Sequence, residues 1–353
     1  MKDVKYISIQ GVKKINHLVR GSILIVSCIA QPSYASLSFT FNYLPANNAT
    51  LINDPVQGFN DPVFGVARQS ALNSAASMIA AYFVNYTANL TYDVYSYSAN
   101  DGFLASAGSD QFLVPGTFQP TIVQEKIFTN GLDDGNGFSA DGTIDWNFYN
   151  GYNWGLTDSL NSSQYDFKFV AMHELLHSFG FLSDIGAKGT GLEGFTAGTP
   201  DTWSYYDQFL TDASGASLIS PDGLFDASKV AALTSGTFNA PGVLFNGSNA
   251  VAANNGQAIP IYSPSTWAEG SSLSHLDSNS TVTHQSIMNP AAHNLGLDVR
   301  TLGAVEIGIL KDIGYVNIAA VPLPADIWLM LGGVLTLLGL NRKKVGPLQT
   351  NGK

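Results

Sequence analysis

Three stretches of the chain repeat apolar residues with helical spacing. In residues 69–84 the repeat places apolar side chains on one face, which predicts an amphipathic helix. The same spacing predicts helices over residues 164–182 and 301–313. The core-facing side of the second helix carries Phe169, Met172, Leu176 and Phe179.

Strand-like alternation occurs between the first two predicted helices. In residues 90–97, Leu90, Tyr92 and Val94 fall on one side, which predicts a half-buried strand. The N-terminal half is therefore predicted to be α+β, with a helix, a small sheet and a second helix. Further short strands, separated by Gly, Asn and Asp clusters, are expected near residues 102–114, 121–128 and 144–149.

Residues 183–273 are rich in Gly, Ser, Thr and Asn, but they carry too many large apolar side chains to leave in water. We therefore expect a packed, loop-rich region rather than a linker. The chain has 353 residues, 45% of them hydrophobic, which is enough for one large domain. We expect this domain over residues 36–320, with an N-terminal subdomain at 36–182 and a C-terminal one at 183–320. The large apolar residues of the loop-rich region are Trp203, Tyr205, Tyr206, Phe209, Leu210, Val243, Phe245, Ile259 and Ile261.

Residues 1–35 are predicted to be a signal peptide. Five Lys and Arg residues precede or border an apolar run at 21–30, and the small-residue pattern Ser33-Tyr34-Ala35 follows. The run is shorter than the roughly 20 residues of a membrane-spanning helix, so export is favoured over anchoring. Cys28 leaves with this leader, unless it is the lipid-modified cysteine of a lipoprotein signal. A mature chain without cysteine must bind a transition metal through His and carboxylate groups.

The C-terminal end carries a second apolar run, residues 327–340, followed by a basic cluster at 342–344. This order is typical of a membrane-retention segment whose basic side stays inside. With VPLPA at residues 321–325 it resembles the VPLPA variant of the PEP-CTERM sorting signals. The resemblance implies that residues 321–344 associate transiently with the membrane and are processed by an exosortase-type machinery. The protein would then be secreted or held at the cell surface, with residues 345–353 as a tail; a plain anchor is the alternative.

The charge of the chain narrows its possible partners. Residues 36–325 keep 7 of the 16 Lys and Arg residues and 25 of the 27 Asp and Glu residues, a formal net charge of −18. Such a surface repels phosphate backbones and lacks the basic stripe that nucleic-acid binding requires. Nucleic acid is therefore not an expected partner.

The strongest chemical signal lies in the second predicted helix, in HELLHSFGF at residues 173–181. His173 and His177 are four residues apart, so they share a helix face and can bind one metal ion. Glu174 is one step round the helix, within reach of a water on that metal. There a carboxylate can act as general base and then protonate a leaving amine. The alternative is a pair of surface histidines on a structural helix, but composition alone produces this motif by chance in roughly one or two chains in a thousand.

A catalytic zinc takes three protein ligands and leaves a fourth position for water. The helix continues to Gly180 and Ser183, and this extension resembles the metzincin peptidases. In that family the glycine allows a sharp turn, and a His or Asp at the position of Ser183 is the third ligand. Serine is a poor zinc ligand, so the short metzincin pattern is broken here. Other candidate ligands are Asp184, Glu193, His284 and His293.

A stronger candidate for the third ligand, His275, lies far along the chain in the Ser-rich turn SSLSHLD, and SIMNP around Met288 follows it. This order resembles the leishmanolysin branch of the metzincins. The resemblance implies that His275 is the third zinc ligand and that Met288 forms a packing floor under the metal. It also implies a secreted zinc-dependent endopeptidase whose two subdomains enclose an active-site cleft. Leishmanolysin's disulfides are absent, but the likeness to secreted PEP-CTERM metalloproteases extends through residues 203–210, 262–277 and 303–315.

Several residues have roles that the sequence leaves open. Asp207 or Asp277 is a candidate to hold a ligand imidazole in its tautomer. Three tyrosines are candidate oxyanion donors, with packing as the alternative role for each. They are Tyr205, Tyr206 and Tyr262.

Two further interpretations compete with the main one. Residues 130–145 loosely resemble a calcium loop, but the ligand spacing fails at Phe138, and a solvated turn-rich loop is the alternative. The chain as a whole could be a non-catalytic surface or matrix protein on a degenerate peptidase scaffold, although the intact Glu174 argues against that. It could also be a zinc hydrolase that acts on a non-protein substrate.

Overall fold

The structure is a computed structural model. The predicted signal peptide with Cys28, the predicted sorting signal, His284 and His293 lie outside the described residues. In the part that is described, no helix is long and apolar enough to cross a membrane. The described residues are 37–45, 58–137, 139–237, 240–280, 283, 285–291 and 295–319.

A four-stranded sheet forms the base of the N-terminal half, in the order β1-β2-β5-β3. Its first three strands run parallel, and β3 pairs antiparallel with β5, so that β3 is an edge strand. The predicted alternation in β2 is confirmed, because Leu90, Tyr92 and Val94 are buried while the residues between them are partly or fully exposed. The strands are β1 (Leu37–Tyr43), β2 (Ala88–Tyr97), β3 (Ala105–Gly108) and β5 (Gly142–Asn147).

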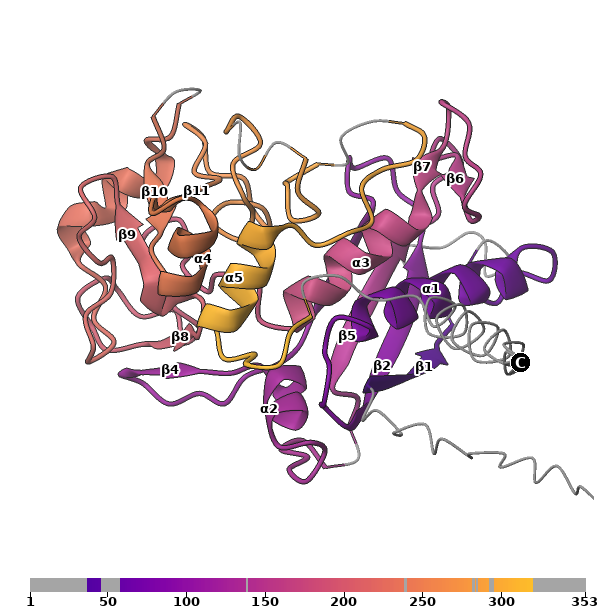
Figure 1. The fold of residues 1–353 in the computed structure, drawn as a ribbon, viewed down its shortest axis with the longest axis horizontal. Coiled ribbons are helices and arrows are strands. Elements are labelled where there is room, and N and C mark those ends of the chain that lie inside the picture. The colour runs from indigo at the N-terminus through magenta and orange to yellow at the C-terminus, as the bar shows by residue number, and fades with distance from the viewer. Residues whose placement is uncertain are drawn as a thin grey trace, which may run out of the picture. The chain divides into compact units, whose positions relative to one another are not determined.

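Two helices, α1 (Gly65–Ala80) and α3 (Phe167–Ser178), lie side by side on one face of this sheet (Figure 1). Aromatic side chains fill the layer between helix and sheet, and the ring of Trp146 on β5 stacks on Phe167 with centroids 3.9 Å apart. The predicted first helix ends earlier than residue 84. The chain after α1 leaves the helix because Phe83 pairs with Ile318, in the last segment of the described chain.

The sequence prediction is wrong at residues 121–128, which form the helix α2 (Ile122–Phe128) instead of a strand. A capping box starts this helix: the Gln124 N–H donates to Thr121 Oγ1 at 3.1 Å, and the Thr121 N–H donates to Gln124 Oε1 at 3.0 Å. The T-x-x-Q signal of such a start was present in the sequence. The strand β1 was not predicted, although its alternating apolar residues pair in register with β2.

The C-terminal half is built from short elements around its own core. An antiparallel sheet of β9, β10 and β11 forms part of it, and α4 packs closely on α5. Gly308 permits that contact, because a Cβ there would lie 2.6 Å from the Ala250 backbone. The elements are β8 (Thr202–Ser204), η1 (Asp207–Phe209), β9 (Leu210–Asp212), η2 (Ala227–Thr234), β10 (Val243–Phe245), α4 (Ser248–Ala253), β11 (Ile259–Ile261) and α5 (Ala304–Asp312).

The prediction that residues 183–273 form a packed region is confirmed, because seven of the nine large apolar side chains there are fully buried and the other two pack partly against them. The two halves are joined by β4 (Thr117–Gln119), which pairs in parallel with β8. A second small pair, β6 (Trp154–Gly155) with β7 (Tyr165–Asp166), leads into α3. The fold is thus mixed, with sheets and several helices, and is compatible with the predicted α+β class.

Candidate metal centre

The helix α3 carries the HELLH motif through the interior of the molecule. It is buried on nearly all sides rather than on one amphipathic face, because the sheet layer covers one side and the C-terminal half covers the other. Its start is fixed by Asp166, whose side chain accepts the Phe169 N–H at 3.0 Å. Arg300 Nε lies 2.8 Å from Asp166 Oδ2, so the last third of the chain also holds this end of the helix.

The other end of α3 is stopped by Gly180. Its φ of +87° is the left-handed conformation that glycine adopts without strain, and an added Cβ would lie 2.2 Å from the Gln124 amide. Side chains from distant segments donate hydrogen bonds to the carbonyls at the end of the helix: Thr121 Oγ1 donates to Ser178 O at 2.8 Å, and the Tyr315 hydroxyl donates to Phe179 O at 2.9 Å. The chain therefore turns sharply after the motif, as the glycine predicted.

Three imidazoles meet on the side of this helix that lines the cavity. The Nε2 atom of His173 lies 3.1 Å from that of His177 and 3.0 Å from that of His275, and His177 Nε2 lies 3.2 Å from His275 Nε2. Among the described residues, these three form the one cluster of His, Cys, Asp or Glu ligand atoms close enough to hold a metal ion. The structure thus brings together the two helix histidines and the distant histidine that the sequence predicted.

The outer nitrogen of each ring faces a main-chain carbonyl. His173 Nδ1 lies 2.6 Å from Ile287 O, His177 Nδ1 lies 2.8 Å from Phe181 O, and His275 Nδ1 lies 2.8 Å from Ser271 O. In a neutral imidazole only one nitrogen carries hydrogen, so a donating Nδ1–H leaves the Nε2 lone pair free. All three lone pairs then point at one another.

Burial keeps two of these rings neutral, those of His177 and His275. Burial, together with the neighbouring imidazole charge, lowers the pKa of His177 and of His275 to about 3. Three lone pairs facing one another repel unless a cation lies between them. In a tetrahedral zinc site with Zn–N bonds of 2.0–2.1 Å, ligand nitrogens are about 3.3 Å apart. The spacings of 3.0 to 3.2 Å are close to that value, so this ligand set fits a metal ion of zinc's size.

A hydrogen-bonded turn places His275 next to the histidines of α3. The Tyr262 N–H donates to His275 O at 2.9 Å, and the Leu273 N–H donates back to Tyr262 O at 2.8 Å. The turn includes Leu273 at a φ of +67°, and Leu276 continues it by bridging to Ile261 on β11. Tyr262 therefore acts here through its backbone.

The alternative ligands that the structure describes contact groups other than the three imidazoles. Ser183 donates its N–H to Ser274 Oγ at 3.1 Å and its hydroxyl to Asp207 Oδ1 at 2.6 Å. Asp184 lies against Asp207, and the burial of Asp184, followed by the charge of Asp207, raises the pKa of Asp184. Glu193 accepts both the N–H and the hydroxyl of Thr202. None of these carboxylates belongs to the histidine cluster.

The expectation that Asp207 or Asp277 holds a ligand imidazole is wrong. Asp207 accepts hydrogen bonds from Ser183, Asp184 and Ser204, while Asp277 Oδ1 accepts from the Asn279 N–H. Main-chain carbonyl groups, not carboxylates, face the Nδ1 atoms of the three imidazoles. Tyr206 is a packing residue, because its buried ring contacts Phe181 and Phe245 at centroid distances of 5.3 and 5.0 Å.

Met288 is fully buried, in the turn that supports two of the histidines. Met288 O accepts the Leu276 N–H at 2.8 Å beside His275, and the preceding carbonyl of Ile287 faces His173. The sequence analysis missed the residue that fixes this turn. Glu306 on α5 is buried, and its carboxylate accepts the Met288 N–H at 3.0 Å and the Gly303 N–H at 2.6 Å. A glutamate three residues after Gly303, inside an apolar helix, was the available signal.

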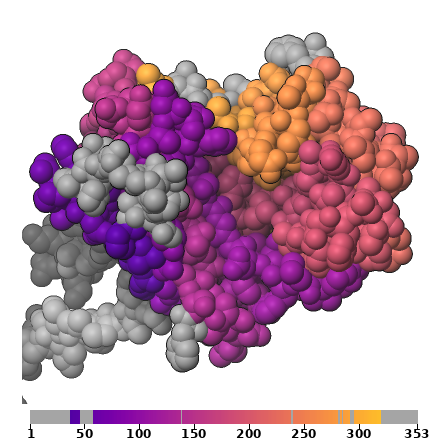
Figure 2. Space-filling view, turned by 180° about the vertical axis from the view of Figure 1, so that it is seen from behind, coloured from indigo at the N-terminus to yellow at the C-terminus, as the bar shows by residue number. Residues whose placement is uncertain are grey.

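Glu174 lies beside the histidines in a large cavity. Its side chain is buried, and burial raises the pKa of Glu174 to about 8, against a smaller opposing effect of a hydrogen bond from the Ala107 backbone. Ala107 belongs to the edge strand β3, which forms one wall of the cavity. The cavity has a volume of about 1020 Å³, and Figure 2 shows the surface hollowed between the purple and magenta N-terminal segments and the orange C-terminal segments.

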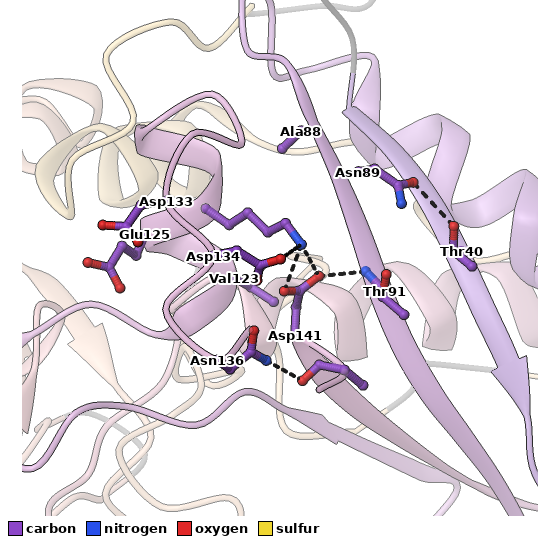
Figure 3. A network of polar contacts seen from close by, with 12 residues as sticks. Thr40, Ala88, Asn89, Thr91, Val123, Glu125, Asp133, Asp134, Asn136 and Asp141 are labelled. Carbon is purple, nitrogen blue, oxygen red and sulfur yellow. Dashed lines mark hydrogen bonds and ion pairs between the residues drawn. The ribbon is translucent and has the colours of Figure 1, made fainter. Parts of the chain in front are cut away.

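The loop that loosely resembles a calcium site is occupied by a cation of the chain itself. Lys126 Nζ lies 3.0 and 3.1 Å from the two carboxylate oxygens of Asp141 and 3.2 Å from Asp134 Oδ2. In Figure 3 these two carboxylates converge on one amino group, and Asp141 also accepts the Thr91 N–H. Asn136 turns away and donates to Ala140 O. These contacts favour the turn-rich loop over a calcium loop.

A scan against models of known protein families finds no match for this chain, and a search of curated proteins finds none either. The functional interpretation therefore rests on the residues and their geometry.

Proposed function

We propose that this chain is a zinc-dependent endopeptidase. One observation carries the proposal: three imidazole Nε2 atoms converge within 3.0 to 3.2 Å beside a buried glutamate, in an open cavity. Ligand type and number favour zinc, because three histidines are typical of catalytic zinc sites that keep one open position.

In the proposed hydrolysis, the zinc ion would activate the attacking water, and the protein would transfer the protons. A zinc ion held by three imidazoles keeps a fourth position for water and lowers the pKa of that water toward 7. Glu174 is the general base of the proposal, since it lies next in the helix to the ligand His173 and faces the same cavity. Its raised pKa in the protein without a cation suits a carboxyl group that takes up a proton and then donates it to a leaving amine.

The wall formed by β3 supports a peptide as substrate. As an edge strand, β3 has one side that is not paired with another strand of its sheet, and residues 102–111 line the cavity without a break. An extended peptide can add to such an edge through main-chain hydrogen bonds. This geometry favours a polypeptide over a compact small molecule.

The architecture is consistent with a metzincin-like peptidase. A parallel sheet with one antiparallel edge strand lies against the metal helix, the chain turns at a glycine after the helix, and a buried methionine lies in the turn behind the histidines. We infer that the two halves correspond to the two subdomains on either side of an active-site cleft in that family. Export and sorting by the two chain ends remain predictions from the sequence.

The test compares the chain with a Glu174→Gln variant in zinc content and in cleavage of unfolded casein. Both proteins are expected to contain zinc, and the variant should lose cleavage by about 100-fold or more, the usual contribution of a general base. Equal cleavage by both proteins contradicts the assignment of Glu174. Hydrolysis of esters or glycans without any cleavage of peptides would favour the rival zinc hydrolase, and zinc without any hydrolysis would favour the non-catalytic scaffold.

A further inference from the structure

Four exposed apolar side chains lie on two loops that meet at Thr202, and two of them, Leu113 and Leu192, line the cavity. Leu113 and Val114 are 61% and 42% exposed, and Leu192 and Phe195 are 39% and 42% exposed. The Val114 N–H donates to Thr202 Oγ1 at 2.8 Å, and the Leu192 N–H donates to Thr202 O at 3.2 Å. We call these four residues the apolar rim.

The apolar rim is continuous with the candidate metal centre. Leu113 and Leu192 line the same cavity as the three histidines and Glu174. Leu113 is also two residues beyond Gln111, where the cavity wall that includes β3 ends, so a chain lying along that wall would reach it. Contiguous apolar side chains left in water at the mouth of a cavity mark a binding surface more often than scattered ones do.

The loop that carries Leu192 and Phe195 is held in shape by hydrogen bonds within the chain. The buried Asp201 carboxylate accepts the N–H groups of Gly191 at 2.8 Å, Glu193 at 2.9 Å and Phe195 at 3.1 Å. Because the loop is already ordered, a ligand that contacts it loses little affinity to the ordering of the surface.

Charge identifies the class of ligand that suits the apolar rim. Among the described residues, no Lys or Arg lines the cavity, while Asp110, Glu174 and Asp184 do. With a formal net charge of −18 over residues 36–325, the protein would be repelled by an anionic membrane surface. A neutral, apolar segment of a polypeptide is repelled neither by the acidic groups that line the cavity nor by the net charge of the protein.

We propose that the apolar rim binds large apolar side chains of an extended polypeptide whose cleaved segment lies at the histidines. The substrates are then unfolded or flexible protein segments with apolar residues at a distance from the cleaved bond. This inference rests on the proposed peptidase function for its cleavage step, but the binding it describes can be measured without cleavage.

The test uses a short, flexible core peptide from the casein sequence, chosen without reference to cleavage, and extended forms of it. The extensions carry Leu-Phe-Leu or Ser-Gly-Ser on the N-terminal or the C-terminal side. A Leu113→Ser/Leu192→Ser variant is compared with a Leu132→Ser/Leu297→Ser control, which removes two exposed leucines, 91% and 62% exposed, from outside the apolar rim. Peptide binding is followed by fluorescence anisotropy on zinc-loaded proteins that also carry Glu174→Gln.

The peptide with one of the two apolar extensions is expected to bind more tightly than its Ser-Gly-Ser counterpart. The affinity of the rim variant for that peptide should fall by about tenfold for each leucine replaced. The control should keep its affinity for that peptide. If the rim variant loses the same affinity for core and extended peptides, or loses none, the proposal that the apolar rim binds apolar side chains is wrong. If wild-type protein cleaves no peptide while the rim variant still weakens binding of the apolar peptide, the peptidase proposal fails and the apolar rim stands.

Discussion

At the scale of single residues, the candidate metal centre depends on main-chain carbonyls. Ile287, Phe181 and Ser271 each present a carbonyl to the Nδ1 of one histidine. Any residue type provides a carbonyl, so no sequence pattern identified these partners, and the sequence suggested aspartates instead. The position of each carbonyl is set by other groups, and for Ile287 the buried Glu306 is one of them.

Glu306 predicts a measurable pH dependence of stability. Burial raises the pKa of Glu306 from its ordinary value to about 7, so the folded protein keeps a proton that the unfolded chain releases above pH 4.5. Stability contributed by the protonated group is complete below pH 4.5 and is lost as the pH rises through 7, a change of about 3 kcal/mol at most. A Glu306→Gln substitution removes this contribution and leaves one N–H without its acceptor.

The measurement is urea unfolding of zinc-free protein at pH 5 and pH 7.5. The wild type should exceed Glu306→Gln in free energy of unfolding by about 1–3 kcal/mol at pH 5, and by clearly less at pH 7.5. A Glu269→Gln control, at an exposed glutamate, should show no such pH-dependent difference. A difference between wild type and Glu306→Gln that is the same at both pH values contradicts this account.

At the scale of elements, the turn at the end of α3 orients the HELLH motif for metal binding. The chain must turn at Gly180 so that Phe181 can present its carbonyl to His177. Periodicity in the sequence located α3, β2 and α5 because apolar residues recur in each at helical or strand spacing, although α3 is buried on nearly all sides. It failed at α2, where a seven-residue helix is too short for a repeat to be read and only its capping box distinguishes it from a strand.

A pair of glycine substitutions tests the role of this turn. Gly180 and Gly198 have nearly the same φ, +87° and +88°, but an added Cβ meets the buried Gln124 at Gly180 and nothing within 4 Å at Gly198. Gly198→Ala should cost only the backbone strain of roughly 1–2 kcal/mol. Gly180→Ala should cost about 1–3 kcal/mol more, because Gln124 must move.

Urea unfolding of both variants measures these costs, and zinc affinity measures the consequence for the site. Gly180→Ala should bind zinc more weakly than Gly198→Ala, since it displaces the segment that orients His177. Equal stability losses and equal zinc affinities would show that the turn has no special part in the metal centre.

At the scale of the whole molecule, the site is shared between two halves that are far apart in sequence. The N-terminal half supplies His173, Glu174 and His177 from one helix, and the C-terminal half supplies His275 from a turn after β11. The helix residues were predictable from spacing, whereas His275 was predicted only through the resemblance of the motif order to a known branch of zinc peptidases. The packing of the second half, and with it the apolar rim, could not be predicted, because its short elements are fixed by contacts between distant residues, such as that of Val114 with Thr202 and that of Met288 with Glu306.

The measurement that tests the central claim most directly is the zinc affinity of the full chain, by chelator competition, for wild type, His275→Ala and His284→Ala. The account predicts one zinc per wild-type chain and unchanged affinity in His284→Ala. His275→Ala should lose more than the roughly 10–100-fold that follows loss of an outer hydrogen-bonding partner. Wild-type zinc affinity in His275→Ala, or no zinc binding by the wild-type chain, would contradict it.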